Sequence, residues 1–347
     1  MLFLDSNFIT EKGAEGLAEC LKNKQDLRVF NIDNNSIGPT GAKKLALQLT
    51  TNYGLSKLYC DSNNIGEEGA EAMAECMEMM DSLKKICMEN NNIKDRGCKA
   101  LAKALEENDT LLSLYLENNQ ITSLGAQQIG MILSNKYKLS KINLNNNPLR
   151  DEGIMAIANG LIENDTLRVI TLQNISISES CIPYLSKCLH NKKFLTKLLL
   201  DGNVIGIQGA KMLSNGIRDN ETLTNLHLSD CLILEDGAKE LAKSLENKRN
   251  LLVLDLTNNK IMSDGCIAIC KSIQNQSTLR ELMLSLNFIG PGGAKAVSKV
   301  LANIKYITEL SLSTNGIFSE GAVALGAALK DKKYLEVFNL KKNEIGI

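Results

Sequence analysis

The stretch Leu55-Ser56-Lys57-Leu58-Tyr59-Cys60-Asp61-Ser62-Asn63-Asn64-Ile65-Gly66 contains the pattern that organises the whole chain. Its Asn63 belongs to a series of positions spaced by 28 residues, which runs through the 347-residue sequence without an insertion or a deletion. Self-similarity at a fixed spacing is typical of repeat architectures. Eleven of the thirteen positions in the series are asparagine: Asn7, Asn35, Asn63, Asn91, Asn119, Asn147, Asn203, Asn259, Asn287, Asn315 and Asn343. The other two positions hold Ile175 and Cys231.

Each repeat has two halves with different periodicities. Around Leu58, apolar and polar residues alternate, which predicts a short strand with one buried face. After Gly69, the apolar residues follow helical spacing, with Met73 and Met77 on one helix face. The unit is therefore a strand, a loop and a helix. Because no single unit can bury its apolar side alone, neighbouring units are expected to stack into one continuous core.

These features predict an α/β fold, a right-handed βα solenoid with about 12 repeats of 28 residues. Parallel strands lie about 4.8 Å apart, whereas packed helices need about 8–10 Å. The array is therefore expected to curve into a horseshoe, with the parallel sheet on the concave face and the helices on the convex face.

The repeated asparagine and glycine have separate expected roles. An asparagine that points inward after the strand carries both a donor and an acceptor, so it can bridge successive loops as a ladder. A glycine follows six residues later, as Gly69 follows Asn63. That glycine indicates either backbone clearance or a special dihedral angle before the helix.

The residues from Leu55 to Gly66, followed by Gly69 and Ala70, resemble the leucine-rich repeat. The 28-residue unit with Asn or Cys at the ladder position is similar to the ribonuclease-inhibitor-like subclass, which also forms sensor regions of NOD-like receptors and the core of Ran GTPase-activating proteins. The resemblance covers essentially the whole chain and implies a single solenoid over residues 1–347. Neither end has a polar capping segment, so a fragment of a longer protein is expected.

Composition restricts the partners and the cellular location. Lys and Arg total 39 and Asp and Glu total 40, for a formal net charge of -1. This balance gives no global reason to expect a nucleic acid or an anionic membrane as partner. The sequence lacks an apolar run of about 18 residues and a secretory signal. The ten cysteines fall at unrelated points of the period, without a metal knuckle, which predicts free thiols in a cytoplasmic protein with no metal and no cofactor.

The strand register predicts a protein-binding face. The side chains two residues before the ladder Asn point outward from the concave face, and the first five of them are acidic, beginning with Asp5. With two tyrosines from the neighbouring column, they form a stripe suited to a basic protein segment. The predicted partner-binding residues are Asp33, Tyr59, Asp61, Glu89, Tyr115 and Glu117. The alternative is a solvated face neutralised by Lys57 and Lys85; calcium bridging is disfavoured, because such sites usually take ligands from one compact loop.

One repeat departs from the pattern. The unit around Ile175 loses both the ladder Asn and the Gly, with Cys181 in the Gly position and Pro183 at the start of its helix. Proline is tolerated in a first helical turn. The unit therefore predicts a local kink or a loosened loop in the middle of the array, and simple drift in a redundant repeat accounts for it as well.

Catalysis has little support in the sequence, so the expectation is a non-enzymatic scaffold. The two histidines are His190 and His227, and a triad of His227, Ser229 and Asp255 is disfavoured on an open surface without an oxyanion hole. The resemblance implies three alternatives: a GTPase-activating protein, a NOD-like receptor sensor region or a ribonuclease inhibitor. The segment 34–39 is similar to a loop of Ran GTPase-activating proteins, although the repeat consensus explains it equally well.

Overall fold

The computed structural model describes the chain except for residues 23, 136–137, 191, 193, 247 and 347. It divides into two compact units, Met1–Ser176 (unit 1) and Ile177–Ile347 (unit 2). The boundary falls inside the irregular repeat around Ile175. A single solenoid over residues 1–347 stays a prediction. Over the described residues, no helix is long and apolar enough to cross a membrane.

Unit 1 alternates strands and helices in the order that the repeat predicts. Its strands pair in parallel and in chain order from β1 to β7. The elements are β1 Leu2–Phe3, α1 Glu11–Leu21, β2 Val29–Asn31, α2 Gly38–Leu49, β3 Lys57–Tyr59, α3 Gly66–Glu78, β4 Lys85–Cys87, α4 Lys94–Glu107, β5 Ser113–Tyr115, α5 Ser123–Ser134, β6 Lys141–Asn143, α6 Arg150–Leu161 and β7 Val169–Thr171.

Unit 2 begins with an exception and then follows the same order. A 3-10 turn, η1, precedes its first helix, and its strands pair in parallel from β8 to β13. The elements are η1 Glu179–Cys181, α7 Ile182–Leu189, β8 Lys197–Leu199, α8 Gly206–Ile217, β9 Asn225–His227, α9 Leu234–Leu245, β10 Val253–Asp255, α10 Met262–Ile273, β11 Glu281–Met283, α11 Gly290–Asn303, β12 Glu309–Ser311, α12 Phe318–Leu329 and β13 Val337–Asn339.

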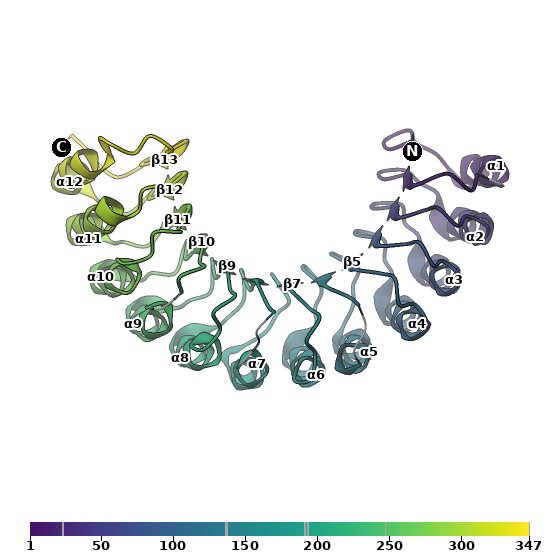
Figure 1. The fold of residues 1–347 in the computed structure, drawn as a ribbon, viewed down its shortest axis with the longest axis horizontal. Helices are drawn as coiled ribbons and strands as arrows, with labels where there is room; N and C mark the ends of the chain where they lie inside the picture. Colours follow the sequence, from purple (N-terminus) through teal and green to yellow (C-terminus); the bar gives the residue numbers. More distant parts are fainter. Residues whose placement is uncertain (23, 136–137, 191, 193, 247, 347) are drawn as a thin grey trace. The chain divides into compact units, whose positions relative to one another are not determined.

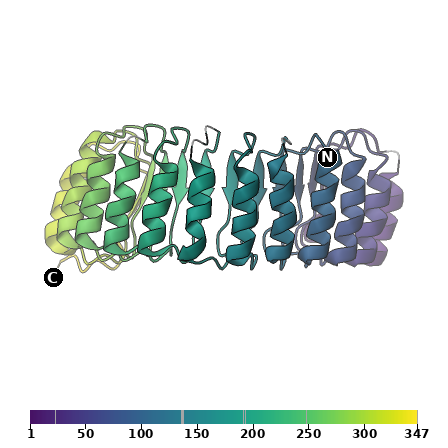
Figure 2. The ribbon, with the colours of Figure 1, turned by 90° about the horizontal axis from the view of Figure 1, so that it is seen from below.

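Within each unit the helices lie side by side on the outer face and the strands line the inner face (Figures 1 and 2). The core lies between these layers. In the third repeat, for example, Leu58 of β3 and Met73 and Met77 of α3 are each 2% exposed or less. The predicted leucine-rich repeat βα solenoid is confirmed.

The asparagine ladder is present as predicted. Asn91 Oδ1 accepts from the main-chain N–H groups of Asn63 (2.9 Å) and Ile65 (3.3 Å), and its Nδ2 donates to the carbonyls of Cys60 and Glu89 (both 2.9 Å). The side chain therefore satisfies four buried or half-buried backbone groups from two successive repeats. Where Cys231 takes the ladder position, its Sγ contacts two main-chain carbonyls instead.

The glycine column serves backbone clearance. A Cβ on Gly97 would lie 2.8 Å from the Cβ of Ala70 in the preceding repeat and 2.7 Å from Cγ2 of Ile93. Such separations are too short for carbon atoms, so the start of one helix approaches the next only because this position has no side chain. The left-handed dihedral angle occurs three residues earlier, at Gly66 (φ 68°) and also at Lys94 (φ 53°). Clearance, rather than a special dihedral, therefore accounts for the column.

The irregular repeat has a 3-10 turn before its helix, and the predicted kink or loosened loop there stays a prediction. The turn η1 takes the place of the first helical turn, so α7 has 8 residues and Pro183 lies in its first turn. The ten cysteines are free thiols, and nine of them are buried as small core residues. The exception is Cys20, which is exposed.

Candidate functional site

The residues predicted to bind a partner lie together on the inner face of unit 1. The strand register aligns Asn31 with Tyr59, Tyr59 with Cys87, and Cys87 with Tyr115. The acidic residues follow two positions after these, at the carboxyl ends of β2 to β5. The six predicted residues, all half-buried, are Asp33, Tyr59, Asp61, Glu89, Tyr115 and Glu117. Their alignment follows from the fold, and their role in binding stays a prediction.

Main-chain groups hold the first part of this acidic row. Asp33 Oδ1 accepts from the N–H of Asp61 at 2.7 Å, and Asp61 Oδ1 accepts from the N–H of Glu89 at 2.7 Å. Each carboxylate thus reaches across to the next strand, which fixes its direction on the face. Hydrogen bonds to a charged acceptor are among the stronger ones in proteins, so these carboxylates are pre-organised.

Two asparagines that were not predicted to matter hold the other end of the row. Asn143 Nδ2 donates to Glu89 Oε1 (2.9 Å) and to Glu117 Oε2 (3.0 Å), and Asn146 Nδ2 donates to Glu117 Oε1 (2.7 Å). Asn143 stands in the same outward column as the tyrosines, and this is the signal by which the sequence marks it. It neutralises no charge, so it bridges the two glutamates without removing their repulsion.

Burial and mutual repulsion oppose the ionisation of three carboxylates of this row, Asp33, Asp61 and Glu89. Burial, with smaller contributions from the neighbouring carboxylates of Asp33 and Glu89, raises the pKa of Asp61 to about 7, against the opposing effects of a hydrogen bond from the Glu89 backbone and of Lys85. Burial, and then Glu117, also raises the pKa of Glu89. The pKa of Asp33 is raised mainly by burial. Asp61 therefore gains its charge as the pH rises through neutrality.

The two tyrosines already hold a cation of the same chain. Lys85 Nζ lies 4.7 Å from the ring centroid of Tyr59 and 4.7 Å from that of Tyr115. Both separations suit a cation–π interaction. The lysine that the sequence suggested as a neutraliser of the acidic face thus lies between the rings. Within the described residues, neither Lys57 nor Lys85 forms an ion pair with the acidic row.

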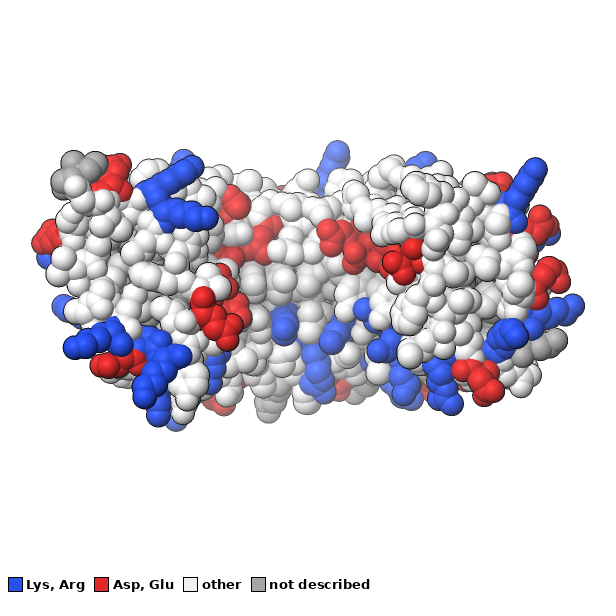
Figure 3. Space-filling view, turned by 90° about the horizontal axis from the view of Figure 1, so that it is seen from above, with Lys and Arg blue, Asp and Glu red and all other residues white. Residues whose placement is uncertain are grey.

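Charge is segregated on this face. In the space-filling view, acidic side chains of the N-terminal half gather in a row on the strand face, and basic side chains gather in a separate band below them (Figure 3). The strand direction explains the separation, because Lys57, Lys85 and Lys141 open β3, β4 and β6 whereas the carboxylates follow the strand ends.

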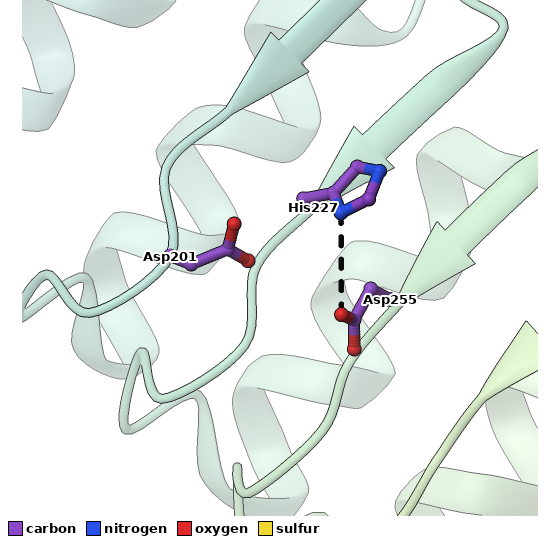
Figure 4. Close-up of side chains that lie close together, drawn as sticks. All are labelled: Asp201, His227 and Asp255. Carbon is purple, nitrogen blue, oxygen red and sulfur yellow. Dashed lines mark ion pairs between the residues drawn. The ribbon is translucent and has the colours of Figure 1, made fainter. Parts of the chain in front are cut away.

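A second polar cluster lies on the strand face of unit 2. His227 Nδ1 lies 4.0 Å from Asp255 Oδ2, and Asp201 brings a carboxylate to the same place from the segment after β8 (Figure 4). Burial, and to a smaller extent Asp201, raises the pKa of Asp255. Hydrogen bonds from Thr257 and the electrostatic effect of the His227 imidazole oppose that rise. Ser229 donates its main-chain N–H to Asp201 Oδ1 at 2.7 Å. The cluster groups His227 with two carboxylates, and the sequence interpretation missed Asp201.

Comparison with known proteins agrees with the fold. Seven segments match a family model described as Leucine Rich repeat: residues 23–46, 82–102, 107–130, 138–158, 247–270, 275–298 and 303–326. A chain of the yeast Rad7–Elc1 complex is 16% identical, with a TM-score of 0.61 over 99% of this chain and 76% of that one. A chain of the TLR13–ssRNA13 complex is 18% identical, with a TM-score of 0.53 over 91% of this chain and 43% of that one. No curated protein matches the sequence.

The repeat pattern, the parallel strands and these matches define the class: the chain is a leucine-rich repeat protein. The ribonuclease-inhibitor-like subclass stays a prediction.

Proposed function

We propose that this chain is a non-enzymatic protein-interaction scaffold whose unit 1 strand face binds a basic segment of a protein partner. The observation that carries the proposal is the row of half-buried carboxylates on β2 to β5, held in place by the main chain and by Asn143. Extended concave faces are the usual binding surfaces of solenoid proteins.

The energetics of the row favour a cationic ligand. Carboxylates that raise one another's pKa are destabilised as charged groups, so a cation placed among them relieves repulsion as well as adding attraction. Their positions are pre-organised, which lowers the ordering cost on binding. The four acidic positions span three strand separations, or about 15 Å, which matches about five residues of an extended segment.

Lys85 defines where such a segment lies. Because its ammonium group is held between Tyr59 and Tyr115, basic side chains of a partner are directed to the carboxylates and away from the rings. The tyrosines then offer ring edges and hydroxyl groups at the border of the acidic row. They contribute contact area, while the carboxylates select the charge.

The test is binding of a fluorescein-labelled lysine-rich peptide of about ten residues, measured by fluorescence anisotropy. The test variant carries four isosteric substitutions on the row: Asp33→Asn, Asp61→Asn, Glu89→Gln and Glu117→Gln. The control variant removes four exposed helix carboxylates of the same unit: Glu75→Gln, Glu78→Gln, Glu106→Gln and Glu107→Gln.

The test variant should bind the peptide at least about tenfold more weakly and with a flatter salt dependence, while the control variant binds as the unchanged chain does. Reversal of the four row residues to lysine should abolish binding. Equal affinity of the two neutralised variants would remove the acidic row from consideration, because net charge alone would then explain the binding.

The alternatives raised by the resemblance predict different activities. A GTPase-activating protein would accelerate GTP hydrolysis by a Ran-like small GTPase, and a ribonuclease inhibitor would suppress ribonuclease turnover. A NOD-like receptor sensor region would require a nucleotide-binding module in the same protein. The expectation that no nucleic acid binds is tested by single-stranded RNA as a competitor in the anisotropy assay. A cytoplasmic location stays a prediction.

A further inference from the structure

Three neighbouring strands of unit 2 bring an imidazole and two carboxylates to one place. Asp201 follows β8, His227 ends β9 and Asp255 ends β10. One ligand atom from each, the imidazole nitrogen and two carboxylate oxygens, lies within 4.8 Å of the others. Figure 4 shows the Asp201 carboxylate directed toward His227, and His227 Nδ1 facing Asp255.

Main-chain N–H groups donate hydrogen bonds to both carboxylates of the cluster. Asp201 Oδ1 accepts from the N–H of Ser229 (2.7 Å), and Asp255 Oδ1 accepts from the N–H of Thr257 (2.9 Å). These bonds orient each carboxylate while the rigid strand register sets the separation. Outer contacts of this kind are the ones that position the ligands of metal sites.

The separations suit a divalent transition-metal ion better than a simple ion pair. With Zn–N and Zn–O distances of about 2.0–2.2 Å, tetrahedral ligands lie about 3.4 Å apart, so a cluster within 4.8 Å needs only small side-chain rotations. As an ion pair, the His227–Asp255 contact of 4.0 Å is at the limit of such contacts. Asp201, which is 8% exposed, is the most buried member of the cluster.

We propose that Asp201, His227 and Asp255 form a metal-binding site for a divalent transition-metal ion, with Zn²⁺ as the reference ion. Two carboxylates and a neutral imidazole balance the charge of the ion, and the nitrogen ligand selects Zn²⁺ over Mg²⁺, which prefers oxygen. His227 and Asp255 are partly exposed, so the ion reaches the site from the strand face. Three protein ligands leave a coordination position for water or for a group of a bound partner.

The chain contains its own control, because it has two histidines. His190 is exposed at the end of α7, and its Nδ1 lies 3.8 Å from Asp219 Oδ2. Among the described residues, it belongs to no group of three potential metal ligands. The exposed thiol of Cys20 competes for zinc, so the experiment uses the full chain carrying Cys20→Ser.

The experiment is calorimetric titration with ZnCl₂, repeated with MgCl₂. The Cys20→Ser chain should bind one Zn²⁺ per chain, much more tightly than Mg²⁺. His227→Gln and Asp255→Asn should each weaken Zn²⁺ binding at least about tenfold, and His190→Gln should leave it unchanged. Asn at position 255 keeps the acceptor for the Thr257 N–H, so this variant is expected to fold.

Imidazole nitrogen resonances of the unsubstituted histidines provide a second measurement that needs no variant at either position. Zinc should shift the Nδ1 signal of His227 and leave that of His190 in place. Zinc binding of equal strength in the His227→Gln and Asp255→Asn chains, a shift confined to His190, or the absence of sub-millimolar binding would overturn the proposal.

Discussion

Raising the pH from 6 to 8 should strengthen peptide binding to the unit 1 face by about tenfold. The cause is Asp61, whose pKa is about 7 because burial disfavours its charged form and because Asp33 and Glu89 repel it. With a pKa near 7, about one-tenth of the Asp61 side chains are ionised at pH 6 and about nine-tenths at pH 8. If a cationic peptide binds only the ionised form, its apparent affinity rises in proportion to that fraction.

The sign follows from linkage between proton and peptide. A bound cation favours the carboxylate, so the pKa of Asp61 in the complex falls below its value in the free chain, and binding releases a proton. Affinity is therefore present above about pH 7 and is lost as the pH falls through that value. The neighbouring groups that set the pKa are Lys85, Asp33 and Glu89, together with a hydrogen bond to the Glu89 backbone.

The assay is peptide anisotropy at pH 6, 7 and 8 at constant ionic strength, with Asp61→Asn as the comparison. Asparagine keeps Oδ1 as the acceptor for the Glu89 N–H but cannot titrate, so its affinity should change little over the same range. A carbon-13 titration of the Asp61 carboxyl in the free chain measures the pKa without any peptide.

Two results would refute this reasoning in different ways. A carboxyl titration near the ordinary value of about 3.9 would show that the row does not resist ionisation. An undiminished pH dependence in Asp61→Asn would show that another group controls binding. Absence of peptide binding, with the pKa near 7 confirmed, would instead reject the proposed partner and leave the electrostatics intact.

Three further predictions concern stability, measured by urea unfolding. Lys248 Nζ donates to three main-chain carbonyls. Burial lowers the pKa of Lys248 to about 8, below its value in the unfolded chain. The unfolding free energy should therefore rise between about pH 8 and pH 10.5, by up to about 3 kcal/mol relative to Lys248→Gln. Parallel pH profiles of the two chains would contradict this. Asn91→Ala should lose about 2–4 kcal/mol because four backbone groups lose their side-chain partner, and Asn91→Cys, which introduces the residue type found at ladder position 231, should lose less. Gly160→Ala should destabilise the chain by about 1–3 kcal/mol because the new Cβ would lie 2.0 Å from the Gly130 carbonyl oxygen. At Gly326 a Cβ would meet open space, so Gly326→Ala should be neutral or stabilising. Equal effects of the two substitutions would show that the contact between helices is not the cause.

The repeat made much of the fold predictable. A residue type that recurs every 28 positions returns to the same place in each turn, so the role of Asn91 could be inferred from its column, and so could the burial of Cys231. Alignment of the acidic positions followed from the same argument, because parallel strands in register place equal columns side by side.

Individual contacts of long side chains were not predictable in this way. The alternative interpretation had Lys85 neutralise carboxylates, but its flexible stem places the ammonium group between Tyr59 and Tyr115. The bridge that Asn143 makes between Glu89 and Glu117 depends on rotamers as well. Strand periodicity specifies which side of the sheet a residue faces, and it does not specify which of several neighbours the end of its side chain reaches.

The sequence by itself determined the strand–loop–helix unit, the ladder and the identity of the outward columns, because these depend on translational repetition. The tertiary structure decided how side chains from different columns meet. Asp201 lies two positions before the ladder residue Asn203, whereas His227 and Asp255 lie four positions before the ladder residues Cys231 and Asn259, so the cluster combines two different columns. Only the lateral stacking of β8, β9 and β10, with the directions that main-chain N–H groups impose on the carboxylates, brings the three side chains within reach of one ion.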